Sequence, residues 1–291
     1  MLTVALDDRR SEAALGGLPR RVPLSHGALT ALAERCAVPL PWRTGAAGLA
    51  ASLGDHPSHD GSQPDVMAEL VAAGLLDSGG SVSGEVVTAL TRLVVADVAV
   101  DITLALRRPS GATAQLSAWH RLNSAQVTTL TSTLDGAELC WSELGWWWAA
   151  LSALADVPTR PGEADGPTPG LCLPWELLLA AGTSVRERRD ELLPLLAGRF
   201  PGEVTVDGAA VDRGRVLDEL GVLARAPLGR LQVCVIGGSG RLGIISWLHF
   251  SDGWRELVPA RSGQAPSVRV DAVAPAALAA RVAALATRVR P

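Results

Sequence analysis

DITLALRRPSGATAQLSAWH, residues 101–120, and RLQVCVIGGSGRLGIISWLH, residues 230–249, are the two stretches that decide the fold. Each begins with alternating apolar residues, reaches a Ser-Gly turn and then continues into a second apolar stretch. Alternation with a period of two is typical of β-strands, so each stretch predicts an antiparallel hairpin. The two stretches lie 129 positions apart without a gap, which places His120 and His249 at matching positions.

The same shift of 129 positions extends beyond the hairpins. It pairs Val87 with Val216 in a preceding helical pattern and Leu139 with Val268 in a following strand pattern. Because the order of the elements repeats, we expect two similar halves. The predicted fold is α+β, a quasi-two-fold antiparallel β-sheet flanked by helical bundles. Residues 1–156 form the N-terminal half, 157–170 a proline-rich linker and 171–291 the C-terminal half, and both halves belong to one domain.

Capping residues and periodicity place the helices around this sheet. Ser25 and Asp65 are typical N-caps, and Gly74 is suited to end the second helix. Ser184 with Glu187 three positions later forms a capping-box pattern, which predicts a helix from Ser184 to Phe200. The remaining predictions are helices at 84–95, 146–155 and 276–289 and around 217–223, a helix opened by Pro174, an exposed loop at 54–64, and a four-strand meander at 100–106, 115–122, 126–133 and 137–142.

The composition excludes several classes of function. The chain has 291 residues, a net charge of −4 and 26 basic residues, all of them arginine. Without lysine there is no Schiff-base amine and no P-loop or kinase-type lysine. The acidic balance and the absence of a long basic run argue against a nucleic-acid partner. The longest bulky uncharged stretch, 144–155, is too short to span a bilayer. The first residues lack a secretory leader pattern and the four cysteines are scattered, so we expect a cytoplasmic protein without membrane insertion.

One glycine motif suggests a nucleotide, and the residues after it argue against one. Gly238, Gly240 and Gly243 match the G-x-G-x-x-G fingerprint of dinucleotide-binding proteins. That fingerprint works only if a helix N-terminus follows, because the helix amides bind the pyrophosphate. Residues 244–250, IISWLHF, form a strand pattern instead, so we expect a hairpin turn. A dinucleotide-dependent oxidoreductase remains the alternative.

No other pattern of reactive residues predicts a catalytic or metal site. His56, His59 and Asp60 could bind a metal, but a flexible polar loop with an intervening proline is a poor ligand scaffold. Ser, His and Asp occur without a G-x-S-x-G elbow. We therefore predict no catalytic residues, no cofactor and no metal.

The nine tryptophans are the less ordinary feature, and three of them, Trp146, Trp147 and Trp148, are consecutive. On a helix such neighbours point about 100° apart, so at most two can face one core. The third is expected to reach a rim or a partner surface, unless the helix is wedged between sheet and bundle. With no tyrosine and two phenylalanines, tryptophan is the most available aromatic anchor for an interface.

Several short motifs resemble the EspG family of type VII secretion-associated proteins of actinobacteria. They are residues 67–77, MAELVAAGLLD, with Gly84 and Val87 before the next helix, then Gly240-Arg241, Asp252-Gly253-Trp254, and Pro259-Ala260 before the last helix. The resemblance follows the order and spacing of the elements from Val22 to Val289.

This resemblance implies a cytoplasmic chaperone that is not an enzyme. Family members bind the tip of a PE–PPE heterodimer, cover its apolar end, keep it soluble and deliver it to the secretion apparatus. They contact the client through the sheet and the C-terminal bundle. By position we expect contacts from the helix at 184–200 and from six residues of the sheet: Trp119, His120, Arg121, Trp247, His249 and Arg255. A non-catalytic module of another complex is a further alternative, and the free protein is a possible homodimer.

Overall fold

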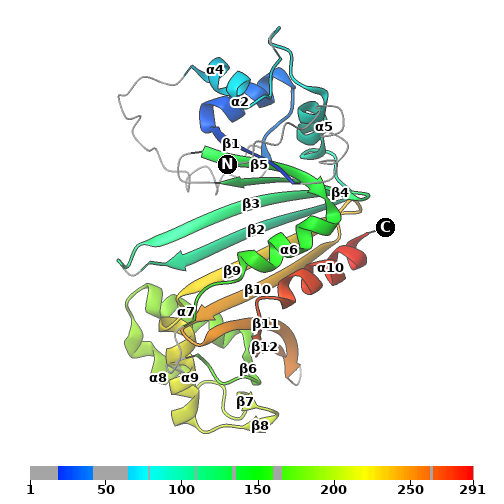
Figure 1. Ribbon diagram of the computed structural model, residues 1–291. Helices are drawn as coiled ribbons and strands as arrows, with labels where there is room; N and C mark the ends of the chain where they lie inside the picture. Colours follow the sequence, from blue (N-terminus) through cyan, green and yellow to red (C-terminus); the bar gives the residue numbers. More distant parts are fainter. Residues whose placement is uncertain are drawn as a thin grey trace, which may run out of the picture.

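The computed structural model describes residues 19–41, 65–77, 79–108, 110–132, 136–159, 166–262 and 265–290. Within these ranges, twelve strands form one sheet and helices cover parts of both faces (Figure 1). This confirms the predicted α+β class. The predicted loop at 54–64 and its residues His56, His59 and Asp60 lie outside the described residues.

The first half of the chain contains the predicted helices and the meander. Its elements are β1 (Arg20–Ser25), α2 (His26–Arg35), α4 (Val66–Ala72), α5 (Gly84–Arg92), β2 (Val98–Arg107), β3 (Thr113–Asn123), β4 (Gln126–Ser132), β5 (Gly136–Glu143) and α6 (Leu144–Leu154). The Ser25 hydroxyl accepts a hydrogen bond from the Ala28 N–H at 3.1 Å, and Asp65 caps α4. Gly74, with φ of +66°, follows α4. All three predicted helix signals are confirmed.

The second half repeats much of this order. Its elements are β6 (Leu171–Pro174), α7 (Trp175–Arg186), η1 (Asp190–Leu192), α8 (Leu193–Ala197), β7 (Thr205–Val206), β8 (Ala209–Ala210), α9 (Arg213–Arg225), β9 (Gly229–Gly237), β10 (Leu242–Phe250), β11 (Gly253–Ser262), β12 (Ala265–Val273) and α10 (Ala277–Val289). β3 begins at Thr113 and β10 at Leu242, which is the predicted shift of 129 positions.

The strand order places the two halves side by side. The sheet reads β1-β5-β4-β3-β2-β9-β10-β11-β12-β6-β7-β8, so each half contributes a meander and β2 pairs with β9 at the centre. In that central antiparallel ladder Thr103 lies opposite Gln232, its own counterpart under the 129-residue shift. The two-fold rotation and the domain boundaries themselves stay predictions.

Helices pack on the sheet in three groups, each with its own core. α2, α4 and α5 cover the outer strands of the first half, and α7, α8 and α9 cover those of the second half. Strand alternation puts Trp119 in the first of these cores and Phe250 in the second. α6 and α10 lie over the central strands on the opposite face, where Trp147 and Trp247 are buried (Figure 1).

The capping-box prediction in the second half was wrong. Ser184 lies inside α7, where its hydroxyl donates to the Ala180 carbonyl at 2.9 Å. Leu177, Ala181 and Ser184 form one buried helical face, so packing continues the helix through the predicted start. The chain then turns at Arg188, whose φ is +59°, into η1 and α8. A single helix over residues 184–200 is therefore replaced by the end of α7 and two short helices.

Candidate partner-binding site

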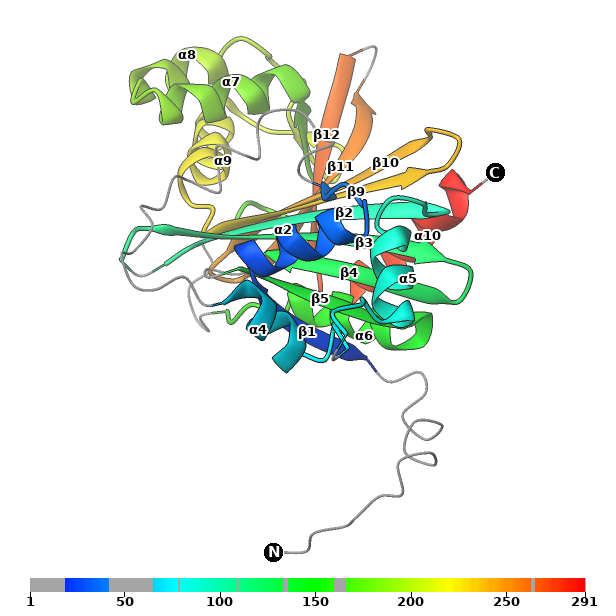
Figure 2. The same ribbon diagram turned by 90° about the horizontal axis from the view of Figure 1, so that it is seen from above.

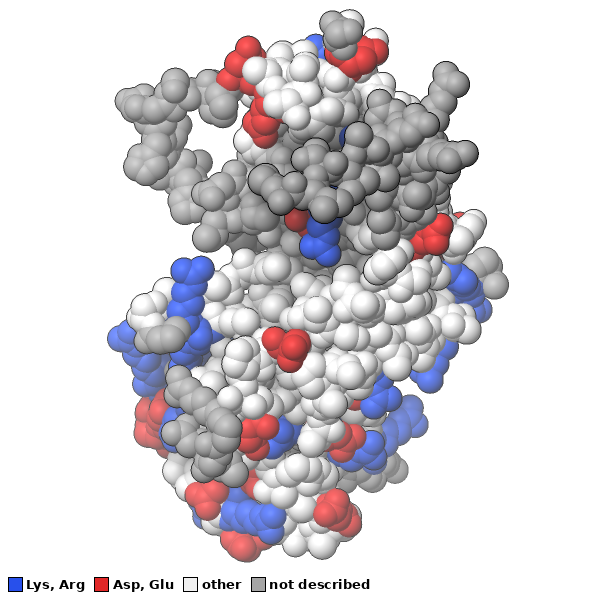
Figure 3. Space-filling model, viewed as in Figure 1, with Lys and Arg blue, Asp and Glu red and all other residues white. Residues whose placement is uncertain are grey.

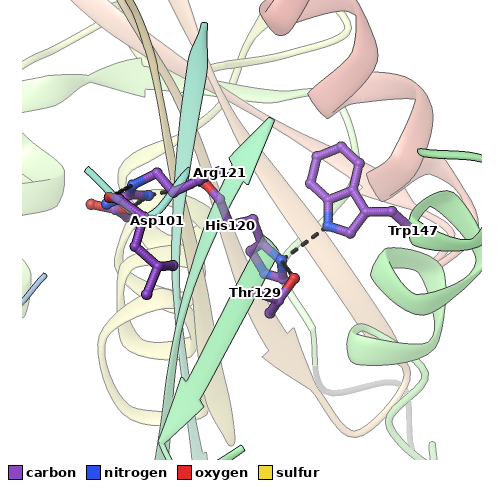
Figure 4. A network of polar contacts seen from close by, with 6 residues as sticks. Asp101, His120, Arg121, Thr129 and Trp147 are labelled. Carbon is purple, nitrogen blue, oxygen red and sulfur yellow. Dashed lines mark hydrogen bonds and ion pairs between the residues drawn. The ribbon is translucent and has the colours of Figure 1, made fainter. Parts of the chain in front are cut away.

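The predicted contact residues on β3 are held in an internal network (Figure 4). His120 points toward α6, where its Nδ1 accepts a hydrogen bond from Trp147 Nε1–H at 2.9 Å. The Thr129 hydroxyl lies at 2.9 Å from the same Nδ1. Because Nδ1 accepts, the neutral ring carries its proton on Nε2. Nε2 is buried without a partner among the described residues.

Burial keeps His120 neutral. The loss of hydration and, to a smaller extent, the adjacent charge of Arg121 together lower its pKa from 6.5 to about 3. The imidazole is therefore a neutral hydrogen-bond acceptor at physiological pH, and it fixes the orientation of the buried Trp147 ring.

We expect the His120→Asn variant to lose less stability in acid than the unmodified chain. The unfolded chain takes up the histidine proton near pH 6.5 and the folded chain only near pH 3, so acidification favours unfolding. As the pH is lowered from 6.5 to 3, the free energy of unfolding should fall more steeply in the unmodified chain than in His120→Asn. The difference in slope should be about 1.4 kcal/mol per pH unit. Asparagine offers Trp147 an acceptor that does not titrate.

Urea unfolding at several pH values measures this difference. His26→Asn supplies the control, because it replaces an exposed histidine and leaves the contact between His120 and Trp147 intact. Equal pH slopes for His120→Asn and the unmodified chain would contradict the assignment.

Arg121 points to the opposite face of the sheet. Its guanidinium lies 2.6 Å from an Asp101 carboxylate oxygen, and its Nε donates to the Leu93 carbonyl at 3.3 Å. These contacts join β2, β3 and the end of α5. Since the Arg121 side chain is largely buried, its charge is satisfied internally.

The predicted contact residues of the second half are also internal. Trp247 packs near Trp254 with ring centroids 6.0 Å apart, and His249 lies 4.8 Å from Trp254. Trp254 Nε1 donates to the Ala155 carbonyl at 2.8 Å. Arg255 pairs with Asp252 at 2.5 Å, and burial lowers the pKa of His249 against the opposing effect of Asp252.

Five of the six predicted contact side chains are buried, and Arg121 is nearly so. Their burial is at odds with direct contact, because helices cover both faces of the sheet where these residues lie. They are core residues that hold β3 and β10 against α5, α6 and the linker. A partner surface must be sought among exposed side chains.

The three consecutive tryptophans of α6 divide as the helical geometry predicts. Trp147 is buried, Trp148 is half-buried with its ring 4.7 Å from that of Trp147, and Trp146 is 50% exposed. α6 contains no charged residue. Figure 3 shows that the middle of this face of the molecule is mostly uncharged. One tryptophan of the three therefore reaches a surface.

A second exposed apolar surface lies on the C-terminal bundle and was partly missed by the sequence analysis. Trp175 and Leu179 lie one turn apart on α7 and are 39% and 54% exposed. Leu195 of α8 is also exposed, and an ion pair of 3.1 Å joins Glu176 of α7 to Arg199, two residues after the end of α8. We call Trp175, Leu179 and Leu195 the α7–α8 surface. Leu195 falls within the predicted 184–200 segment.

The glycine motif is a hairpin turn, as predicted. Gly240 has a φ of +77°, its N–H donates to the Gly237 carbonyl at 2.9 Å, and the Gly237 N–H donates to the Arg241 carbonyl at 3.0 Å. Among the described residues, the turn is followed directly by strand β10 and not by a helix. The motif thus lacks the amides that a pyrophosphate requires.

The described residues show no group of three or more metal-ligating side chains. Burial raises the pKa of all four cysteine thiols, none of which is in a disulfide. Among the helices described, none is both long and apolar enough to cross a membrane.

Comparison by sequence finds no matching family and no matching curated protein. Comparison by structure does find a match. The type VII secretion system chaperone EspG5 of Mycobacterium tuberculosis, solved in complex with the PE25-PPE41 dimer, has a TM-score of 0.58 to this chain. The chain has the EspG fold. The match covers 94% of this chain and 97% of EspG5 at 13% sequence identity, so the EspG fold accounts for nearly the whole chain.

Proposed function

We propose that this protein is a cytoplasmic chaperone of type VII secretion. It binds the tip of a PE–PPE-like heterodimer, keeps the pair soluble and directs it to the secretion machinery, and it is not an enzyme. The observation that carries the proposal is the structural match along nearly the whole chain to EspG5, which was solved in complex with the PE25-PPE41 dimer.

The α7–α8 surface supports the proposal in physical terms. An apolar patch at the end of a helical bundle aggregates unless another apolar surface covers it. Trp175 and Leu179 offer such a surface on one helix, and a large aromatic side chain among aliphatic neighbours is typical of binding hot spots. The Glu176–Arg199 pair beside them supplies a polar rim.

The buried residues have a supporting role in this proposal. His120 and Trp147 hold α6 on the sheet, and Arg255 holds the linker through the Pro167 carbonyl at 3.2 Å. They keep the two halves in register and so position the bundles. The central Thr103–Gln232 pairing supports a quasi-two-fold relation between the halves.

Co-expression tests the proposal. The chain is produced together with a PE–PPE-like pair encoded beside its gene, and the soluble fraction of that pair is measured with and without the chain. We expect the pair to be insoluble alone and soluble with the chain. Equal solubility in both cases would favour a module of another complex. Thermal stabilisation by a dinucleotide would favour the oxidoreductase alternative.

A further inference from the structure

Strands β10 and β11 pair along only part of their lengths. Trp247–Phe250 of β10 pair with Gly253–Glu256 of β11, whereas the earlier residues of β10 pair with β9 alone. Figure 2 shows β11 and β12 diverging from β9 and β10 beyond this point. Among the described residues, β10 therefore has a free edge from Leu242 to Ser246.

The hydrogen bonds to β9 determine which backbone groups face this edge. The Arg241 carbonyl accepts from the Gly237 N–H at 3.0 Å, and the His249 carbonyl accepts from the Leu228 N–H at 2.7 Å. Odd-numbered residues thus face β9, and alternation turns the N–H and C=O of Leu242 and Ile244 to the free edge. Their side chains are 59% and 54% exposed.

Several other edge positions among the described strands carry groups that block further pairing. At the matching point of β3, the Ser132 hydroxyl accepts from the Ser117 N–H at 2.9 Å and donates to its carbonyl at 3.1 Å. The diverging part of β11 contains Pro259, and alternation directs its missing N–H toward β10. The outermost strand β1 contains Pro23. Proline and capping hydroxyls discourage the addition of a further strand.

We propose that the free edge of β10 receives an extended segment of a partner protein by strand addition. Exposed backbone groups beside alternating apolar side chains are the features that this mode of recognition uses. Leu242 and Ile244 select apolar side chains at alternate positions of the segment. Arg241 is exposed and forms no ion pair among the described residues. It therefore selects a carboxylate at the end of the bound segment that lies beside Arg241.

The path of β11 favours a single extended segment over a second copy of this chain. β11 leaves β10 at Glu256 and continues through Leu257–Ser262 on the same side of β10 as the free edge. A second copy would have to bring its own β9 and its own β11–β12 arm into that space. One extended chain brings neither. This inference concerns a surface other than the α7–α8 surface and does not depend on the chaperone proposal.

The test uses a fluorescent synthetic peptide that alternates valine and threonine and ends in aspartate. In antiparallel addition its C-terminal aspartate lies beside Arg241. Fluorescence anisotropy measures binding to the full chain, and hydrogen exchange reports protection of residues 242–246. Ile244→Pro removes one N–H of the free edge and leaves the β9 ladder intact, so the peptide should bind about tenfold more weakly. Ile244→Val should bind as the unmodified chain does.

A second probe does not depend on the folding of the proline variant. N-methylation of the peptide amides that face β10 should abolish binding, whereas methylation of the other amides should preserve it. Equal binding of both methylated peptides, or no binding of the parent peptide, would overturn the proposal. If the chain self-associates and Ile244→Pro abolishes this self-association, the edge binds a second copy of the chain. That result would overturn the assignment of a partner segment as the occupant.

Discussion

The Trp247→Ala variant is expected to lose about 3–5 kcal/mol of its free energy of unfolding. Trp247 is fully buried between β10, α10 and the Trp254 ring, and alanine would leave a cavity that rigid strands cannot close. The free energy of unfolding of a native domain is only about 5–15 kcal/mol in total. The variant would therefore unfold at a much lower urea concentration than the unmodified chain. Equilibrium unfolding measures the loss.

A matched substitution separates size from polarity. Trp247 Nε1 is buried without a hydrogen-bond partner among the described residues, so phenylalanine removes no hydrogen bond. Trp247→Phe should cost much less than Trp247→Ala. The exposed Trp146→Ala should change stability little. If Trp247→Ala kept full stability and lost only partner binding, Trp247 would be a contact residue after all.

The Trp175→Ala variant is expected to bind the PE–PPE-like pair about 30-fold more weakly or worse, with little change in stability. Trp175 is the one aromatic side chain of the α7–α8 surface, and truncation of a central tryptophan removes most of what such a patch contributes. Leu179→Ala should show a smaller loss in the same direction. Each variant is co-expressed with the pair, and dissociation of the purified complex on dilution, followed by light scattering, measures both.

Trp146→Ala is the control for this prediction. Trp146 is exposed to a similar extent as Trp175, but α6 lies on the opposite face of the sheet. Its substitution should leave the affinity for the pair unchanged. Loss of affinity in Trp146→Ala together with full affinity in Trp175→Ala would move the interface to the uncharged face over α6.

The hairpins and the repeat could be predicted because they depend on local patterns. Alternation identifies β2, β3, β9 and β10. The shift of 129 positions is constant because no insertion interrupts either hairpin. β1 and β6 were missed, since each is short, contains a proline and becomes a strand only by pairing with a distant neighbour, β5 or β12. The extent of α7 was missed because buried packing overrides a local capping signal at Ser184.

The positions of the functional residues could be predicted less well. Alternation shows that Trp119 and His120 point to opposite faces, but not whether a helix covers either face. In this fold α2, α4 and α5 cover one face and α6 the other, so both residues are buried. The exposure of Trp175 could not be predicted from the sequence, because a single tryptophan at the start of a helix is equally compatible with a core position.

The most direct test of the chaperone account is the mass of the complex. The chain and the adjacent PE–PPE-like pair are co-purified and analysed by size-exclusion chromatography with light scattering. The account predicts one co-eluting species that contains all three polypeptides and dissociates in Trp175→Ala. Separate elution of the chain from every such pair, with each component folded, would contradict it.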